Sequence, residues 1–128
     1  MLGDVIELSI VVKDLEAAIE RYGKLFGTKV HTRGESKEFG FKNAILPLGN
    51  GHIEFLEPTD PDKAVGKFLA KKGEGVYLVG FECKDVPGAT ARLKKQGARV
   101  NGREDIAWVH PADAHGVFVE LRHRESYS

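Results

Sequence analysis

Three glutamates stand where a carboxylate could bind a metal ion or a polar ligand. They are Glu7, Glu54 and Glu120, and each lies between apolar residues in a short run with β-strand character. A carboxylate in such a strand needs water, a hydrogen-bond donor or a cation, because burial of an uncompensated charge is costly. Carboxylates alone suit hard divalent cations, whereas imidazole together with carboxylate suits zinc, cobalt or manganese.

An internal repeat predicts how the chain brings these carboxylates together. Lys13-Asp14-Leu15 recurs as Lys84-Asp85-Val86, and Ile53-Glu54-Phe55 recurs as Val119-Glu120-Leu121. Each half predicts a strand, a helix and three further strands, and neither half is long enough to bury a core alone. We therefore expect an α+β fold with paired βαβββ modules that form a curved mixed β-sheet groove, with the helices outside.

Local patterns set the expected bounds of the elements. Helices are predicted over 15–26, 63–72 and 86–96, with Asp14 as the first N-cap and Gly27 as the first stop. Strands are predicted over 5–12, 28–32, 39–48, 52–56, 76–83, 99–100, 106–110 and 117–122. The whole chain, 1–128, is expected to be one domain, with module one at about 4–58, a connecting helix at about 59–73 and module two at about 74–124.

Strand alternation predicts which side chains face the groove. The repeat pairs Glu7 with Leu78 and Glu54 with Glu120, so these four positions should converge there. Arg122 shares a face with Glu120 and is the expected counter-ion of the carboxylates. The candidate ligand-binding residues on the groove side are Ser9, His52, Gly80, Glu82, Trp108, Phe118 and Arg122.

Composition argues against several classes of protein. Lys plus Arg and Asp plus Glu both total 19, which gives no electrostatic case for a nucleic-acid or membrane partner. The single cysteine, Cys83, allows no disulfide within the chain and no cysteine cluster for zinc. No apolar run approaches the ~20 residues of a membrane span, and the start of the chain lacks a signal-peptide pattern. We expect a cytoplasmic protein.

The order and spacing of several motifs resemble the vicinal oxygen chelate superfamily, which contains glyoxalases, bleomycin-resistance proteins and dioxygenases. Within it, the motifs are most similar to those of the methylmalonyl-CoA epimerase family. The motifs are Val12-Lys13-Asp14-Leu15-Glu16-Ala17-Ala18-Ile19, Ile53-Glu54-Phe55-Leu56-Glu57-Pro58, Phe68-Leu69 with Gly73-Glu74-Gly75, and Val109-His110-Pro111 with Gly116-Val117-Phe118-Val119-Glu120-Leu121. The likeness covers nearly the whole chain.

The resemblance implies a metal site with two histidine and two carboxylate positions. Glu54 and Glu120 match the carboxylate positions, whereas Glu7 and Leu78 stand where the histidines are expected. The resemblance therefore implies either a divalent metal (Mn, Mg, Co or Zn) on Glu7, Glu54 and Glu120, or no metal. It also implies an acidic catalytic residue just before the third strand, which is Glu38 here.

Three functions remain open at this point. The first is binding of a small organic or acyl-CoA-type ligand in the groove, by an epimerase-like protein with a degraded metal site. The second is a metal-dependent isomerase or lyase of the methylmalonyl-CoA epimerase or glyoxalase type that uses an all-carboxylate site. The third is a metal-free resistance protein that sequesters its ligand. The resemblance also implies a homodimer.

Overall fold

The computed structural model describes residues 1–124, which divide into two compact units. The first unit is Leu8–Tyr77, and the second unit joins Met1–Glu7 to Leu78–Ser128. Strand β1 (Val5–Val11) and strand β5 (Gly75–Glu82) therefore each contribute residues to both units. The first seven residues belong with the second half of the chain and not with the half that they precede.

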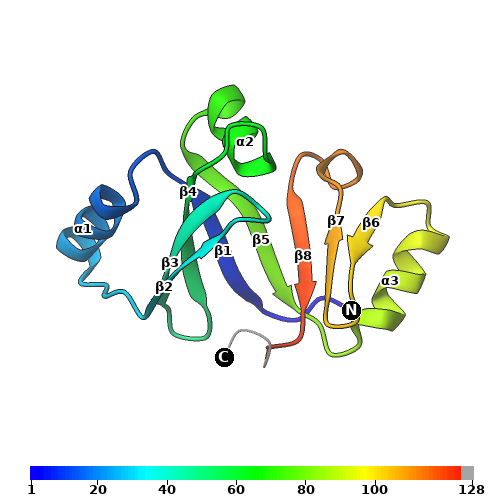
Figure 1. Ribbon diagram of the computed structural model, residues 1–128. Coiled ribbons are helices and arrows are strands. Elements are labelled where there is room, and N and C mark those ends of the chain that lie inside the picture. The colour runs from blue at the N-terminus through cyan, green and yellow to red at the C-terminus, as the bar shows by residue number, and fades with distance from the viewer. Residues whose placement is uncertain (125–128) are drawn as a thin grey trace. The chain divides into compact units, whose positions relative to one another are not determined.

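The first unit is built from a helix, a three-stranded meander and a second helix. These elements are α1 (Leu15–Phe26), β2 (Thr32–Ser36), β3 (Phe41–Pro47), β4 (His52–Pro58) and α2 (Ala64–Lys72). The strand order is β2-β3-β4-β1, and both neighbouring pairs within the meander are antiparallel. One face of these strands packs on α1 (Figure 1), through Leu15, Ala44, Leu46 and Phe55.

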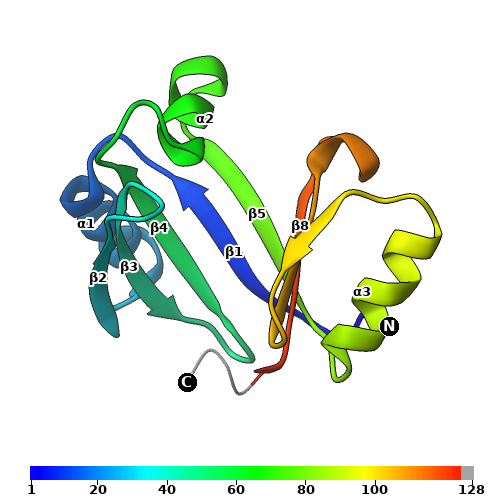
Figure 2. The ribbon, with the colours of Figure 1, turned by 45° about the vertical axis from the view of Figure 1, so that its right-hand side comes forward.

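The second unit repeats this order of elements and has a mixed sheet. It contains α3 (Val86–Lys95), β6 (Val100–Gly102), β7 (Ile106–Val109), the short 3₁₀ helix η1 (Pro111–Asp113) and β8 (Phe118–Arg122). The strand order is β5-β8-β7-β6; β8 is parallel to β5 and antiparallel to β7. Helix α3 lies beside β6 and β7 (Figures 1 and 2), and its Val86 and Ala89 pack on Ala107 and Leu121.

The two long helices start in the same way, as the repeat predicts. The Asp14 carboxylate accepts a hydrogen bond from the Ala17 N–H at 3.1 Å, and the Asp85 carboxylate accepts one from the Gly88 N–H at 3.0 Å. Each aspartate thus satisfies a donor that the first helical turn leaves open. Gly27 ends α1 in the left-handed conformation, with φ 68°, which glycine adopts without strain.

The α+β fold and the two related modules are confirmed, and several of the predicted bounds differ from those of the structure. The strand predicted at 28–32 is wrong, because β2 runs over Thr32–Ser36. Val30 packs in the core without belonging to a strand, whereas the exposed side chains of β2 give no apolar pattern. Strand β7 ends at Val109 and not at 110, because the His110 side chain caps η1. Strand β6 begins at Val100 and extends to Gly102.

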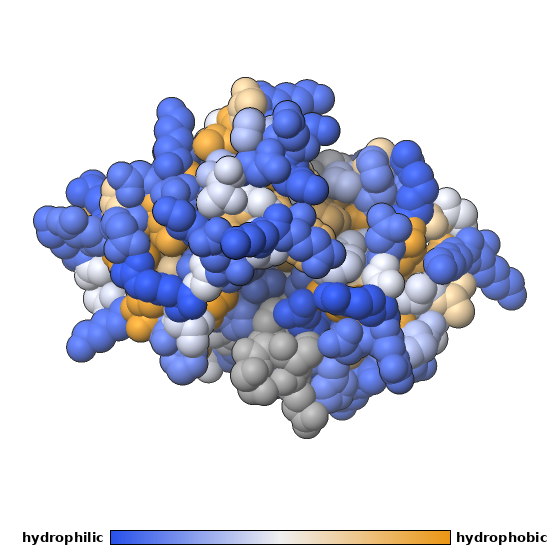
Figure 3. Space-filling model, in the orientation of Figure 1, coloured by the Kyte–Doolittle hydropathy of each residue, from blue (hydrophilic) through white to orange (hydrophobic). Residues whose placement is uncertain are grey.

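Charged and polar side chains cover most of the face shown in Figure 3, with apolar side chains scattered among them. This surface fits the equal numbers of acidic and basic residues in the chain. Of the helices that the structure describes, none is long and apolar enough to cross a membrane.

Candidate functional site

In the first unit, Glu54 on β4 accepts hydrogen bonds from two neutral side chains. The Ser9 hydroxyl donates to Glu54 Oε1 at 3.1 Å, and the Asn43 amide donates to Glu54 Oε2 at 2.7 Å. Ser9 is almost fully buried, at 1% exposure. The register explains the second bond, because Ile45 pairs with Glu54 and Asn43 pairs with Leu56, which makes Asn43 a diagonal neighbour on the same face.

Gly34 leaves room for the amide that holds Glu54. It pairs with Asn43 across β2 and β3, and a Cβ atom at Gly34 would lie 2.9 Å from Asn43 Oδ1. The absence of a side chain at this position therefore lets the Asn43 amide lie over β2. The predictions from sequence missed Asn43, although its alternation with the core residues Ala44 and Leu46 places it on the same side as Glu54.

In the second unit, Glu120 on β8 is the corresponding buried carboxylate, at 4% exposure. Trp108 lies directly opposite it on β7, and the indole Nε1–H donates to Glu120 Oε1 at 2.9 Å. The Arg122 guanidinium lies on the same strand face, with its Nε atom 4.0 Å from Glu120 Oε2. One carboxylate oxygen is therefore bound by a neutral donor, and the other lies near a cation.

The register of the second unit places most of the predicted site residues on one face. Gly80 on β5 pairs with Glu120, and the neighbouring pairs on the same face are Leu78 with Phe118 and Glu82 with Arg122. The opposite face of these strands packs on α3 through Phe81, Cys83, Val119 and Leu121. The face that carries Glu120, Trp108 and Arg122 is hereafter called the Glu120 face.

Glu82 on this face is held by an arginine that the sequence predictions missed. Arg124 donates to Glu82 Oε2 from Nη2 at 2.8 Å and from Nε at 3.2 Å, and its Nη2 also lies 3.3 Å from Asp4 Oδ2. Asp4 lies just before β1, and its carbonyl accepts a hydrogen bond from the Glu82 N–H at 2.8 Å. Glu82 thus ties the start of the chain to the segment that follows β8.

The remaining candidates lie on different elements of the two units. Glu7 is buried in the second unit, at 5% exposure, whereas His52 is half-buried at the start of β4 in the first unit. Glu38 lies exposed in the turn between β2 and β3. Tyr77, which precedes Leu78, packs edge-on against Phe68 of α2 and faces the core as predicted, and burial raises the pKa of its hydroxyl.

The four positions that the resemblance implies for metal ligands are Glu7, Glu54, Leu78 and Glu120. Across residues 1–124, no three His, Cys, Asp or Glu side chains form a group that could hold a metal ion. Glu54 lies in the first unit and Glu7 and Glu120 lie in the second, and a metal shared by the three stays a prediction. Leu78 has no donor atom, and Glu120 already has a tryptophan N–H and a guanidinium beside it.

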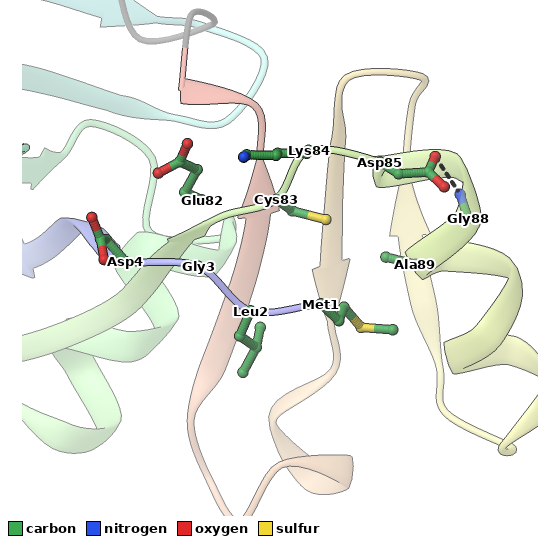
Figure 4. Close-up of a pocket in the computed structure, with 10 residues that line it drawn as sticks. All are labelled: Met1, Leu2, Gly3, Asp4, Glu82, Cys83, Lys84, Asp85, Gly88 and Ala89. Carbon is green, nitrogen blue, oxygen red and sulfur yellow. Dashed lines mark hydrogen bonds between the residues drawn. The ribbon is translucent and has the colours of Figure 1, made fainter.

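A hollow of about 650 Å³ lies elsewhere in the second unit (Figure 4). It is lined by Met1–Asp4, by the end of β5 and by the start of α3. Glu82 is the only predicted site residue among those that line it. The hydrogen bond drawn there, from the Gly88 N–H to Asp85, is the N-cap of α3. Apart from Glu82, this hollow therefore shares no residue with those named on the Glu120 face.

Comparison with known proteins gives the chain close relatives over almost its full length. The chain is 31% identical to the ethylmalonyl-CoA/methylmalonyl-CoA epimerase of Cereibacter sphaeroides, over 94% of this chain and 98% of that one. It is 31% identical to the human mitochondrial methylmalonyl-CoA epimerase, over 94% of this chain and 73% of that one.

Solved structures agree with these relatives. A Streptomyces coelicolor methylmalonyl-CoA epimerase variant, in complex with 2-nitronate-propionyl-CoA, matches with a TM-score of 0.88 and 35% identity, over 94% of this chain and 96% of that one. A methylmalonyl-CoA epimerase in complex with methylmalonyl-CoA and NH4+ matches with a TM-score of 0.86 and 34% identity, over 94% of both chains. The model of the Glyoxalase/Bleomycin resistance protein/Dioxygenase superfamily matches residues 7–119. The chain belongs to this superfamily.

Proposed function

We propose that this chain binds an acyl-CoA thioester of the methylmalonyl type, as an epimerase-like protein. The observation that carries the proposal is the near full-length likeness to methylmalonyl-CoA epimerases, which includes structures with acyl-CoA-type ligands bound. Further support comes from Glu54 and Glu120, which stand at the two carboxylate positions that the family resemblance implies. Hydrogen bonds from Ser9, Asn43 and Trp108 hold these carboxylates in place.

An epimerase must remove a proton from the carbon between the thioester and the carboxylate of its substrate. The proposed base is Glu38, whose exposed place in the β2–β3 turn would allow its carboxylate to take that proton. The negative charge that develops on the substrate then needs donors or cations close by, because such electrostatic stabilisation is usually the largest catalytic term.

The metal positions fit poorly, so no step is assigned to a metal. Leu78 offers no ligand atom, and Arg122 places a positive charge within 4.0 Å of Glu120. The alternative is an isomerase or lyase with an all-carboxylate metal site, which is favoured by the burial of both Glu7 and Glu120. The metal content of protein purified without a histidine tag would test this alternative. About one divalent ion per chain, lost in both Glu54→Ala and Glu120→Ala, would support it.

Calorimetric titration with methylmalonyl-CoA tests the proposal directly. We expect saturable binding near one equivalent per chain, accompanied by a change in the fluorescence of Trp108, the only tryptophan. Free coenzyme A serves as the control ligand. If neither methylmalonyl-CoA nor propionyl-CoA binds, the proposal fails, and the metal-free sequestering protein becomes the leading alternative.

Incubation of the complex in deuterium oxide then separates binding from catalysis. An active epimerase exchanges the proton at the carbon between the two carbonyl groups, and mass spectrometry detects the added mass of methylmalonyl-CoA. We expect Glu38→Gln to abolish any exchange and to leave binding within about threefold of wild type. Exchange that persists in Glu38→Gln would reject Glu38 as the base.

A further inference from the structure

We infer that Arg122 is the group that recognises the free carboxylate of the bound thioester, in place of a metal ion. The inference rests on the proposed function and assigns a specificity-determining residue to it. It predicts a ligand of the 2-carboxyacyl thioester class, in which a carboxylate and a thioester share one carbon atom.

The position of Arg122 is the first argument. It follows Glu120 by two residues on β8, so both side chains lie on the Glu120 face, and Glu82 and Ile106 are its neighbours across the strands. The Arg122 side chain is 23% exposed, whereas that of Glu120 is 6% exposed. In this ion pair the side chain of the cation is therefore more exposed than that of the carboxylate.

The charges around Arg122 form the second argument. Glu82, its acidic neighbour across the strands, accepts both a 2.8 Å and a 3.2 Å hydrogen bond from Arg124. Glu120 Oε1 accepts a hydrogen bond from Trp108 Nε1 at 2.9 Å. Arg122 Nε lies 4.0 Å from Glu120 Oε2, which is the outer limit of an ion pair. Glu82 and Glu120 thus each accept a hydrogen bond from a residue other than Arg122.

The chemistry of the ligand gives the third argument. A guanidinium offers two parallel N–H donors that match the two oxygens of a carboxylate, and it keeps its charge at every physiological pH. A metal ion would need the same position near Glu120, but the guanidinium would repel it and Leu78 could not bind it. Replacement of one cation by the other would keep a positive charge beside the substrate carboxylate.

Two ligands that differ only in the carboxylate test this inference. The affinities of methylmalonyl-CoA and propionyl-CoA are measured by calorimetry for wild type, Arg122→Gln and Arg122→Lys. We expect Arg122→Gln to weaken binding of methylmalonyl-CoA about tenfold or more, because a hydrogen bond to a charged group is lost, and to change propionyl-CoA less than twofold. The affinity of Arg122→Lys for methylmalonyl-CoA should lie between those of wild type and Arg122→Gln, because lysine keeps the charge and loses the paired donors.

The controls separate this role from a structural one. Arg99→Gln removes an arginine of the same unit that binds Asp113 instead, and it should leave both affinities unchanged. Far-ultraviolet circular dichroism and thermal melts check that each variant folds. If Arg122→Gln fails to fold, Arg122→Lys provides the test. It should weaken the binding of methylmalonyl-CoA and leave the binding of propionyl-CoA unchanged.

Three outcomes would overturn the inference. The first is equal weakening of both ligands, which would make Arg122 a structural residue. The second is unchanged discrimination between the ligands in a folded Arg122→Gln variant. The third is discrimination that disappears after dialysis against EDTA and returns with Mn²⁺, which would assign the charge to a metal. If wild type binds neither thioester, the proposed function fails together with this inference, whereas each of the three outcomes rejects only the role of Arg122.

Discussion

At Glu54 and Glu120, side chains that carry no charge supply the donors that a buried or half-buried carboxylate requires. Ser9 and Asn43 donate to Glu54, and Trp108 donates to Glu120. Such bonds stabilise the protein modestly when intact, but loss of a donor leaves a poorly solvated acceptor behind. The three donors are therefore both structural residues and determinants of where the carboxylate oxygens point.

The bond between Trp108 and Glu120 leads to the first prediction. Trp108→Phe keeps most of the ring volume and removes the N–H that donates to Glu120 Oε1. We expect the free energy of unfolding to fall by about 1–3 kcal/mol, because the acceptor lies in a residue of 4% exposure. Urea denaturation monitored by circular dichroism measures this free energy, since the variant has no tryptophan left for fluorescence.

A double-mutant cycle with Glu120→Ala, which removes the acceptor, provides the control. If the bond carries the effect, the two substitutions should be non-additive, with a coupling of about 0.5 kcal/mol or more. Strict additivity would mean that Trp108 stabilises the fold through its ring alone.

The Asp113 carboxyl has a clearly lowered pKa. Its carboxylate accepts hydrogen bonds from the Arg99 side chain at 3.0 and 3.2 Å and from the Arg99 N–H at 2.9 Å. These bonds, the side-chain bonds foremost, lower the pKa of the carboxyl from 3.8 to about 2. A lowered pKa stabilises the fold above the unfolded value, near pH 4, and this contribution disappears as the pH falls through about 2.

Titration of the Asp113 carboxyl carbon by nuclear magnetic resonance checks this value. We expect a midpoint near pH 2 in wild type. In Arg99→Gln the midpoint should rise only part of the way to the ordinary value, because the backbone N–H of residue 99 still donates. A wild-type midpoint near pH 4 would contradict the prediction.

The sequence predicted some of these candidate residues but could not predict their hydrogen-bond partners. Glu54, Glu120, Ser9 and Trp108 stood out because alternation in a strand depends only on local order. Asn43 and Arg124 were missed, because their contacts depend on strand register and on where the chain returns after β8. Register is a property of paired strands, and a single sequence does not display it.

At the scale of elements, the repeated Lys-Asp pair starts both α1 and α3. Asp14→Ala and Asp85→Ala should each lower the free energy of unfolding by about 1 kcal/mol, because each removes the side-chain acceptor of an N-cap. Thermal and urea denaturation measure the two variants in parallel. The repeat predicts losses of similar size.

Glu20→Ala is the matched control for these caps. Glu20 forms an exposed ion pair with Lys24 on α1, and such a pair contributes about 0.5 kcal/mol or less. A loss in Glu20→Ala equal to that in Asp14→Ala would mean that surface charge, and not capping, explains the effect.

Element order was predictable because caps, stops and apolar spacing are local signals. Strand β2 was misplaced for the same reason, since its Thr-Arg-Gly-Glu-Ser sequence lacks an apolar face. It is a strand because β3 pairs with it, from Thr32 with Ile45 to Ser36 with Phe41. An edge strand with polar side chains also resists pairing with other chains.

At the scale of the whole molecule, the repeat in sequence predicts two related units but not where the chain passes between them. Met1–Glu7 belongs to the second unit, where the Gly3 N–H donates to the Glu82 carbonyl at 2.8 Å. Each unit is therefore completed by residues from β1 or β5. Deletion of the first few residues should disturb the second unit, although those residues precede the first unit in the sequence.

The superfamily resemblance predicts a homodimer, and large apolar side chains that a second copy could cover are exposed on each unit. Met1, Leu2, Val5 and Val117 in the second unit, and Phe26, Leu48 and Val76 in the first, are large apolar residues that are more than 40% exposed. Burial of such residues against a second copy would remove apolar area from water and stabilise the assembly.

Light scattering coupled to size-exclusion chromatography measures the assembly directly. We expect a mass twice that of the 14.1 kDa chain, and a melting temperature that rises with protein concentration, because association stabilises the folded state by mass action. A single-chain mass at every concentration, together with a melting temperature independent of concentration, would contradict the dimer. Methylmalonyl-CoA binding by such a monomer would then show that one chain is sufficient for the proposed function.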